Sequence, residues 1–173
     1  MKRIVLTGAI SLAALIPLAH AAPGDKAKAE MKDRDGKVLG TVMLTEAPHG
    51  ILLAGDLSQL SPGPHGLHIH TVGKCEPPFT TAGGHFNPAG GKHGFESASG
   101  AHAGDLPNLH ASADGKAVVD LVAQGLTLSG GATGLLDQDG AAVVIHAKAD
   151  DYRTDPAGDS GDRIACGVVT QVH

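Results

Sequence analysis

The segment Gly66-Leu67-His68-Ile69-His70-Thr71 reads as a short β-strand with histidines at alternate positions. Side chains at positions i and i+2 of a strand lie on the same face, so His68 and His70 can reach one metal ion side by side. Imidazole nitrogens are ligands that suit copper and zinc. The segment therefore predicts a strand that carries part of a metal site.

Similar short segments recur along the chain on both sides of this one. Asp35-Gly36 and Asp114-Gly115 are hairpin turn signals between such segments. No window has a convincing helical period, and the chain is rich in glycine (25 residues) but poor in aromatic side chains. We therefore expect an all-β fold, either a sandwich or a barrel. The eight expected strands cover residues 27–30, 38–44, 51–57, 66–71, 106–111, 117–122, 141–146 and 165–172.

Two long connections separate these strands. Residues 72–104 have little strand character and are rich in Gly, Pro and His, and residues 150–163 are polar. Connections of this length are usually functional or disordered. The first contains Cys75 and several candidate ligands, so we expect a metal ion and a disulfide to order it.

The N-terminus has the features of a secretory signal peptide. Lys2 and Arg3 precede a mostly apolar stretch from Ile4 to Leu18, and Ala19-His20-Ala21 resembles a cleavage site. The apolar stretch is short for a membrane anchor. Since it would also leave with the signal, we expect no stable membrane insertion of the mature chain. We expect residues 1–21 to be removed and residues 22–173 to form one exported domain.

Charge and cysteine content narrow the possible partners. Loss of Lys2 and Arg3 with the signal changes the formal net charge from −5 to −7, which argues against a nucleic-acid partner. The chain has two cysteines, Cys75 and Cys166. In an exported chain this even pair predicts a disulfide, worth roughly 4–5 kcal/mol in the chain-entropy model for a loop of this length.

Six histidines and one aspartate form two sets of candidate metal ligands. The first set has four imidazoles, which favour copper, and comprises His68, His70, His85 and His146. The second has three imidazoles and a carboxylate, which suit a closed tetrahedral zinc site, and comprises His85, His93, His102 and Asp105. Taken singly, these histidines could be solvated loop residues or core residues. Their conjunction predicts metal binding, although spacing alone allows either two sites bridged by His85 or two independent sites.

Several longer motifs resemble one known family. The strings GLHIH, GGHFNP, HAGDLPNL, VVIHAKADDY and GDRIACGVV resemble copper/zinc superoxide dismutase in its bacterial periplasmic form, and the resemblance extends from about Lys26 to Val169. It implies an eight-stranded Greek-key β-barrel or sandwich with two long functional loops. It also implies one copper and one zinc ion per subunit, with copper bound by His68, His70 and His146, zinc by His93, His102 and Asp105, and His85 bridging both.

The same resemblance assigns roles to residues that do not bind metal. Asp150 would connect a copper ligand to a zinc ligand and set the orientation of both rings. Arg163 would guide superoxide to the copper, since Arg suits the recognition of small anions, and the Cys75–Cys166 disulfide would hold its loop in place. The implied reaction is the conversion of superoxide to O₂ and hydrogen peroxide, with Arg163 and His85 as the catalytic residues.

Three other readings remain at this stage. A periplasmic protein that carries copper or zinc without catalysis would need the ligands but not Arg163. Zinc hydrolysis would need an open zinc position, which a closed site of three histidines and one aspartate does not offer. Asp150 and Arg163 could also be ordinary surface residues, with Arg163 paired to Asp162. We further expect a homodimer if one sheet carries an exposed apolar patch.

Overall fold

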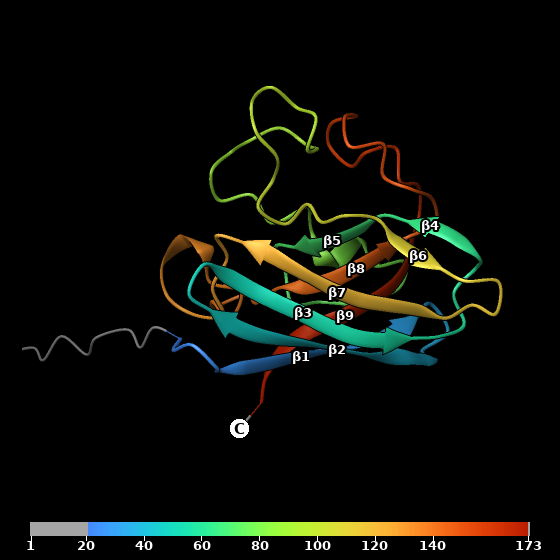
Figure 1. The fold of residues 1–173 in the computed structure, drawn as a ribbon, viewed down its shortest axis with the longest axis horizontal. Coiled ribbons are helices and arrows are strands. Elements are labelled where there is room, and N and C mark those ends of the chain that lie inside the picture. The colour runs from blue at the N-terminus through green and yellow to red at the C-terminus, as the bar shows by residue number, and fades with distance from the viewer. Residues whose placement is uncertain (1–20, 173) are drawn as a thin grey trace, which may run out of the picture.

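The computed structural model describes residues 21–172, which form a curled antiparallel sheet with long loops rising together above one part of it (Figure 1). The strand order in this sheet is β5-β8-β9-β1-β2-β3-β7. Because β9 returns to lie beside β1, the strands β1, β2, β3 and β9 have the Greek-key order. Its strands are β1 (Lys26–Asp33), β2 (Val38–Ala47), β3 (Gly50–Leu57), β5 (Leu67–His70), β7 (Ala117–Gln124), β8 (Ala142–His146) and β9 (Arg163–Gln171).

The all-β Greek-key fold is confirmed, and the structure adds one strand to the eight expected. The strand expected at residues 66–71 is β5, and a short strand that was not predicted, β4 (Gly63–His65), precedes it, with Gly66 between them. β4 pairs with β6 (Leu109–Ala111), and β5 pairs with β8. The chain thus changes partners at Gly66, and nine strands replace the expected eight. The described residues contain no α-helix, only single 3₁₀ turns at Thr80–Ala82 and Gly131–Thr133.

Alternation of side chains places the core inside the curled sheet. In β1, Ala27, Ala29 and Met31 are fully buried, while the lysines and the glutamate between them point to solvent. Strand side chains alternate between faces, so this pattern reflects one buried and one solvated face. The strands β5 and β8 differ because they are buried on both faces.

The second buried face of β5 and β8 is the one that carries the histidines. Leu67 and Ile69 of β5 belong to the main core, so His68 and His70 point to the opposite side. On β8, Val143 and Ile145 likewise belong to the core. The opposite face of β8 therefore carries His146 beside the histidines of β5, underneath the long loops.

A register shift at the end of β8 determines which way Arg163 points. Val144 pairs with Cys166 and Ile145 with Ala165, but His146 pairs with Arg163 because the register shifts between Ile145 and His146. The skipped residue, Ile164, packs against the main core. The shift therefore brings Arg163 to the face that carries His146.

The two long connections and the disulfide are confirmed. The loop between β5 and β6 contains Cys75, which is bonded to Cys166 of β9 with a Cα–Cα distance of 5.6 Å. The loop between β8 and β9 covers residues 147–162. A third connection, residues 125–141 between β7 and β8, was not predicted as a separate feature. The disulfide ties the first loop to the strand that begins with Arg163.

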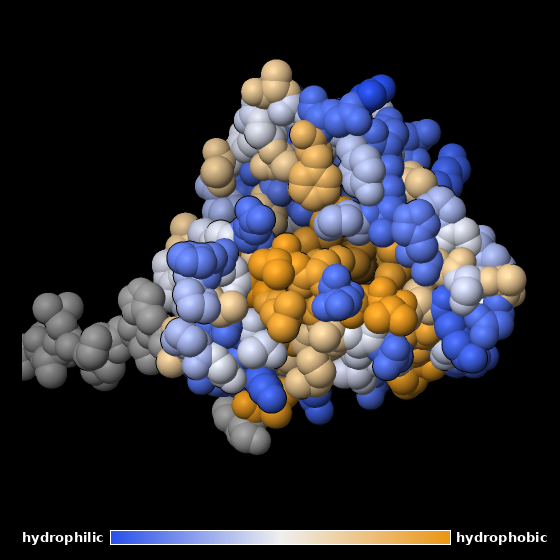
Figure 2. Space-filling model, in the orientation of Figure 1, coloured by the Kyte–Doolittle hydropathy of each residue, from blue (hydrophilic) through white to orange (hydrophobic). Residues whose placement is uncertain are grey.

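Apolar side chains also gather on the outside of the sheet. Leu52 of β3, Val118 of β7 and Val122 of β7 are 41%, 67% and 50% exposed, and Leu52 is the register partner of Val122. Figure 2 shows the corresponding hydrophobic area in the middle of the face over β3 and β7. We call these three residues the β3–β7 patch.

The predicted signal peptide lies outside the described residues, except for Ala21. Within residues 21–172 there is no helix long and apolar enough to span a membrane.

Candidate metal centre

Four histidines place ring nitrogens close together beneath the long loops. His68 and His70 come from β5, His146 from the end of β8, and His85 from the first long loop, and all four are buried. Their candidate ligand atoms lie within 4.8 Å of one another. His85 is held beside β5 by an isolated β-bridge to His70.

One nitrogen of each of these rings is buried and has no hydrogen-bond partner. The atoms are His68 Nδ1, His70 Nε2, His85 Nε2 and His146 Nε2. Most buried polar side-chain atoms in proteins have a partner, because leaving one unpaired costs about 1–3 kcal/mol. Four such atoms in one cluster therefore indicate a site that binds a cation.

The other nitrogens show which form each ring takes. His70 Nδ1 donates to the Gly83 carbonyl at 2.9 Å, and His146 Nδ1 donates to the Gly161 carbonyl at 3.1 Å. His68 Nε2 donates to Asp150 Oδ2 at 2.7 Å. Each ring thus carries its proton on the bonded nitrogen and offers a lone pair on the other. Three lone pairs directed into one small space fit a metal such as copper.

The second set of four residues converges on one carboxylate oxygen. Asp105 Oδ1 lies 2.8 Å from His85 Nδ1, 3.1 Å from His93 Nδ1 and 3.3 Å from His102 Nδ1. In a tetrahedral zinc site with bonds near 2.0 Å, donor atoms lie about 3.3 Å apart. The separations are close to that value, and all four residues are buried. The set therefore fits zinc.

Hydrogen bonds keep the Asp105 carboxylate ionised in this position. Its Oδ2 accepts N–H bonds from Gly94 at 2.9 Å and His102 at 3.0 Å. Burial disfavours the charged carboxylate, but the hydrogen bonds from His85 and Gly94 outweigh this effect and hold the pKa of Asp105 well below its usual range. A charged carboxylate is the form that binds a metal.

His85 faces both sets with different atoms of the same ring. Its Nδ1 lies 2.8 Å from Asp105 Oδ1 and 3.4 Å from His102 Nδ1, whereas its unpaired Nε2 belongs to the first set. The ring also stacks on that of His68 with a centroid separation of 3.9 Å. This geometry distinguishes between the two arrangements that spacing left open, because it favours a bridging ring over two independent sites.

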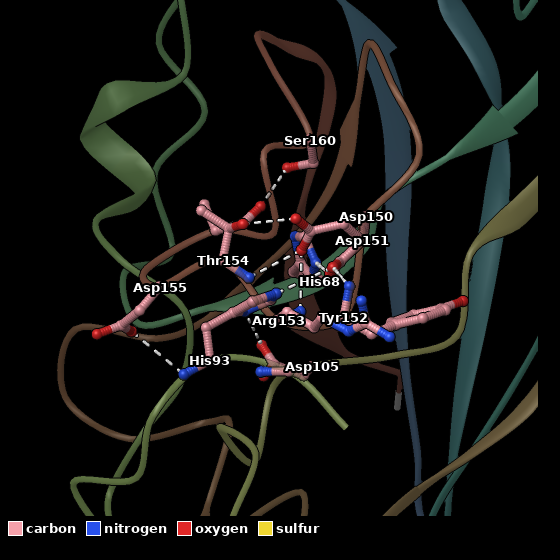
Figure 3. A network of polar contacts seen from close by, with 12 residues as sticks. His68, His93, Asp105, Asp150, Asp151, Tyr152, Arg153, Thr154, Asp155 and Ser160 are labelled. Carbon is pink, nitrogen blue, oxygen red and sulfur yellow. Dashed lines mark hydrogen bonds and ion pairs between the residues drawn. The ribbon is translucent and has the colours of Figure 1, made fainter. Parts of the chain in front are cut away.

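Asp150 connects the two sets from behind. Its Oδ2 accepts from His68 Nε2 at 2.7 Å and its Oδ1 accepts from His93 Nε2 at 3.0 Å (Figure 3). Burial opposes ionisation, but these two bonds and the Tyr152 N–H lower the pKa of Asp150 to about 2. With its proton on Nε2, His93 directs the lone pair of Nδ1 toward the Asp105 carboxylate. Because both atoms are electron-rich, this arrangement needs a cation between them.

Asn108 and Tyr152 hold Asp150 in turn, and the sequence analysis did not identify either residue. Asn108 Nδ2 donates to the Asp150 carbonyl at 2.9 Å, and the Asp150 N–H donates to Asn108 Oδ1 at 2.8 Å. The Asn108 N–H donates to Tyr152 Oη at 2.8 Å. The position of Asn108 three residues after Asp105 is the signal that could have identified it.

Close packing leaves no room for a side chain beside this network. A Cβ on Gly158 would lie 1.9 Å from Asp150 Oδ1 and 2.6 Å from His93 Nε2. Gly158 also has a φ of +65°, a conformation that glycine adopts at little cost. Glycine at this position therefore lets the second long loop close onto the ligands.

Arg163 points toward the first set and does not pair with Asp162. Its guanidinium donates to the carbonyls of Phe79 and Gly83, both at 2.7 Å. The Gly83 carbonyl is the one that also accepts from His70. Burial lowers the pKa of Arg163, but a guanidinium remains charged at neutral pH. Asp162 pairs with Arg34 instead, at 3.3 Å.

Burial and the charge of Arg163 keep the imidazoles of the first set neutral. Burial is the largest cause that lowers the pKa of His70 to about 2, that of His146 to about 3 and that of His85 to about 4. The positive charge of Arg163 contributes at His70 and His146. Metal ligands must be deprotonated, so these shifts favour metal binding at neutral pH.

The remaining histidines lie outside both sets. His65 is buried, with Nδ1 2.7 Å from the His146 carbonyl and Nε2 2.7 Å from the Ser61 carbonyl, so it packs against the strand end. His49 and His110 are exposed. His173 lies outside the described residues.

The sequence profile of the copper/zinc superoxide dismutase family matches residues 38–169. The chain belongs to this family. A copper/zinc superoxide dismutase of Caulobacter vibrioides is 42% identical, with 98% of this chain and 99% of the relative covered. A second copper/zinc superoxide dismutase, from Aquifex aeolicus, is 40% identical over 95% of this chain and 98% of that protein.

Solved structures agree with the family assignment. A superoxide dismutase-like protein from Bacillus subtilis superposes with a TM-score of 0.80 at 41% identity, covering 86% of this chain and all of that one. As a member of the copper/zinc superoxide dismutase family, the chain is an oxidoreductase that acts on superoxide and uses copper and zinc. Both donor sets described above could hold a metal ion.

Proposed function

We propose that His68, His70, His85 and His146 bind copper, that His85, His93, His102 and Asp105 bind zinc, and that superoxide reacts at the copper side beside Arg163. The observation that carries this assignment is the set of four buried, unpaired imidazole nitrogens. The convergence of the second set on Asp105 Oδ1 supports a separate zinc position.

The reaction balances with two superoxide anions and two protons. One anion loses an electron and leaves as O₂, and the second accepts that electron together with two protons and leaves as hydrogen peroxide. Bound copper supplies the reversible one-electron chemistry, whereas zinc is redox-inert. The chain must supply the metal ligands, a positive charge that attracts superoxide and a group that transfers a proton.

His85 is suited to hold and release a proton at Nε2. Its Nδ1 stays with Asp105 on the zinc side, so the ring keeps its orientation while the state of Nε2 changes. His85 Nε2 is buried and has no hydrogen-bond partner among the described residues, so no group of theirs competes for a proton at this atom. We assign His85 the transfer of a proton to the reduced product.

Arg163 provides the positive charge for superoxide. Its guanidinium is fixed by the Phe79 and Gly83 carbonyls, so it is oriented before the anion arrives. A fixed cation next to the reacting centre attracts an anion at little cost in reorganisation. A protein that only carries metal has no need of such a group, which disfavours the non-enzymatic alternative.

Asp150 has a positioning role. It bonds one ligand of each set and thereby fixes the tautomer and plane of both rings. Asp150 itself belongs to neither of the two donor sets.

We further propose that residues 1–21 are an export signal, that the mature domain comprises residues 22–173, and that it works in the periplasm. The basic start, apolar stretch and Ala19-His20-Ala21 support this. The Cys75–Cys166 disulfide is consistent with an oxidising compartment.

We also propose that two copies associate through the β3–β7 patch. Leu52, Val118 and Val122 form an exposed apolar surface on adjacent strands. Exposed apolar clusters of this kind mark interaction sites more often than isolated residues do.

Changing His146 to Ala tests the copper assignment. Removal of one copper ligand should lower superoxide turnover by more than about 100-fold, because even loss of a residue that supports a ligand costs about 10–100-fold. Zinc content should remain near one ion per chain, since His146 is not in the second set. Metal analysis and superoxide loss should be measured together, with His49→Ala as the exposed control. Full turnover by His146→Ala would refute the assignment.

Changing Arg163 to Ala tests the guidance of the anion. We expect the second-order rate with superoxide to fall about tenfold and to lose much of its dependence on salt, because electrostatic attraction is screened by ions. Arg153→Ala is the matched control, since Arg153 is an exposed arginine in the loop that precedes Arg163 and pairs with Glu96. An unchanged rate and salt dependence for Arg163→Ala would make Arg163 a purely structural residue.

Export predicts a defined mature N-terminus. After expression in a bacterial host with a periplasm, the intact mass of the purified protein should correspond to residues 22–173. Replacement of Ala21 by Phe should block cleavage, because a bulky residue does not fit a small-residue cleavage site. Recovery of the full 173-residue chain from the periplasm would contradict the proposed boundary.

Association through the β3–β7 patch predicts a change in molecular mass. Val122→Lys should convert a dimer into a monomer in light scattering, because a charge would be buried in the interface. Val38→Lys places the same charge at an exposed valine of β2 outside the patch and should leave the dimer intact. A wild-type protein that is monomeric at about 100 µM would overturn this proposal.

A further inference from the structure

Arg34 lies outside both donor sets, in the turn between β1 and β2. The turn is fixed by Asp33, whose Oδ1 accepts from the N–H groups of Asp35 at 3.0 Å and Lys37 at 2.9 Å. Gly36 completes it with a φ of +82° and an N–H bond to the Asp33 carbonyl. The backbone of Arg34 therefore has a defined position.

Strand pairing brings this turn next to Arg163. Asp33 of β1 is the register partner of Ala165 of β9, two residues after Arg163. Arg34 Nε donates to the Arg163 carbonyl at 2.9 Å. This carbonyl lies at the shifted register between β8 and β9, where the regular ladder is interrupted. Arg34 thus supplies a contact at a point where the sheet is irregular.

The same guanidinium meets the acidic residue that precedes Arg163. Arg34 Nη2 lies 3.3 Å from Asp162 Oδ2, and the Asp162 side chain is 76% exposed. Without Arg34, Asp162 would leave an uncompensated negative charge beside the residue that receives superoxide. A like charge near the entry site slows the association of an anion.

Another acid of the second long loop is compensated in the same way. Asp155 pairs with Lys92 at 2.9 Å. Asp159 is exposed and is part of the same loop. The loop therefore carries several acids close to an anion-binding residue, and basic residues from other segments offset at least two of them.

We propose that Arg34 is a positioning residue for superoxide capture: it neutralises Asp162, and its bond to the Arg163 carbonyl holds its guanidinium in place to do so. This inference rests on the role proposed above for Arg163. Exposed ion pairs contribute only about 0–1 kcal/mol to folding, so stability does not explain the arrangement. Its effect lies in the field that the substrate meets.

The test compares the fully metallated wild-type protein with Arg34→Gln, Arg34→Lys, Asp162→Asn and the Arg34→Gln/Asp162→Asn double variant. At an ionic strength of about 10 mM, where the Debye length is about 30 Å, Arg34→Gln should lower the second-order rate with superoxide about two- to threefold. Arg34→Lys keeps the charge and should stay near the wild-type rate. The Arg34→Gln/Asp162→Asn double variant should return to the wild-type rate, because both charges of the pair are then absent.

The control and a second readout separate local charge from other effects. Lys26→Gln makes the same change in net charge at the far end of β1, about 26 Å from Arg34 by the rise of a strand, and should change the rate much less than Arg34→Gln does. Copper and zinc content, measured for each variant, shows that metal loading is equal. The affinity for azide, an unreactive small anion followed in the visible spectrum, should fall with the rate in Arg34→Gln.

The outcomes distinguish this inference from the proposed function. If the metallated wild-type protein does not turn over superoxide, the proposed function fails. If it does, and Arg34→Gln matches it in rate, salt dependence and azide affinity, only the role of Arg34 is overturned. The role of Arg34 is also overturned if Arg34→Gln is slower, the double variant is equally slow and Arg34→Lys is no faster. The effect of Arg34 would then not be one of charge.

Discussion

The arrangement of the whole centre depends on one imidazole ring being held between two groups of donors. His85 presents Nδ1 to Asp105 and Nε2 to the histidines of β5 and β8. A ring in this position cannot rotate without abandoning one group, and its stacking on His68 and the bridge between His70 and His85 restrict it further. The long loop after β5 is therefore anchored at the residue that the two donor sets share.

A single backbone carbonyl couples the ligands to the anion-binding group. The Gly83 oxygen accepts from His70 and from Arg163, so a displacement of this peptide would move the His70 ring and the Arg163 guanidinium together. The disulfide attaches the same loop to β9 through Cys75 and Cys166. These contacts explain why a loop with little regular structure can position groups accurately. The histidines, the disulfide and the shared carbonyl acceptor take the place of the backbone hydrogen bonds that order a sheet.

Much of this organisation could be predicted from residue types and spacing. Alternation in β1 and in the His68–His70 segment predicts faces, and residues 72–104 and 150–163 are recognisable as loops. The roles of individual ligands needed family resemblance, because spacing cannot show which nitrogen faces which neighbour. Backbone groups such as the carbonyls of Gly83 and Gly161 leave no trace in the side-chain pattern. The short strand β4 was missed because its pairing with β6 depends on residues that are distant in the chain.

The irregular pairing of β8 with β9 has a consequence for how such a site can change. Strand residues alternate between faces, so a shift by one position reverses the direction of every side chain that follows. In a regular ladder His146 would be opposite Ile164, and Arg163 would point into the core. One extra residue thus turns an inward-facing position toward the first donor set. Whether the number of residues along a strand is odd or even, as much as the choice of amino acid, decides whether this arginine lies beside the proposed copper site.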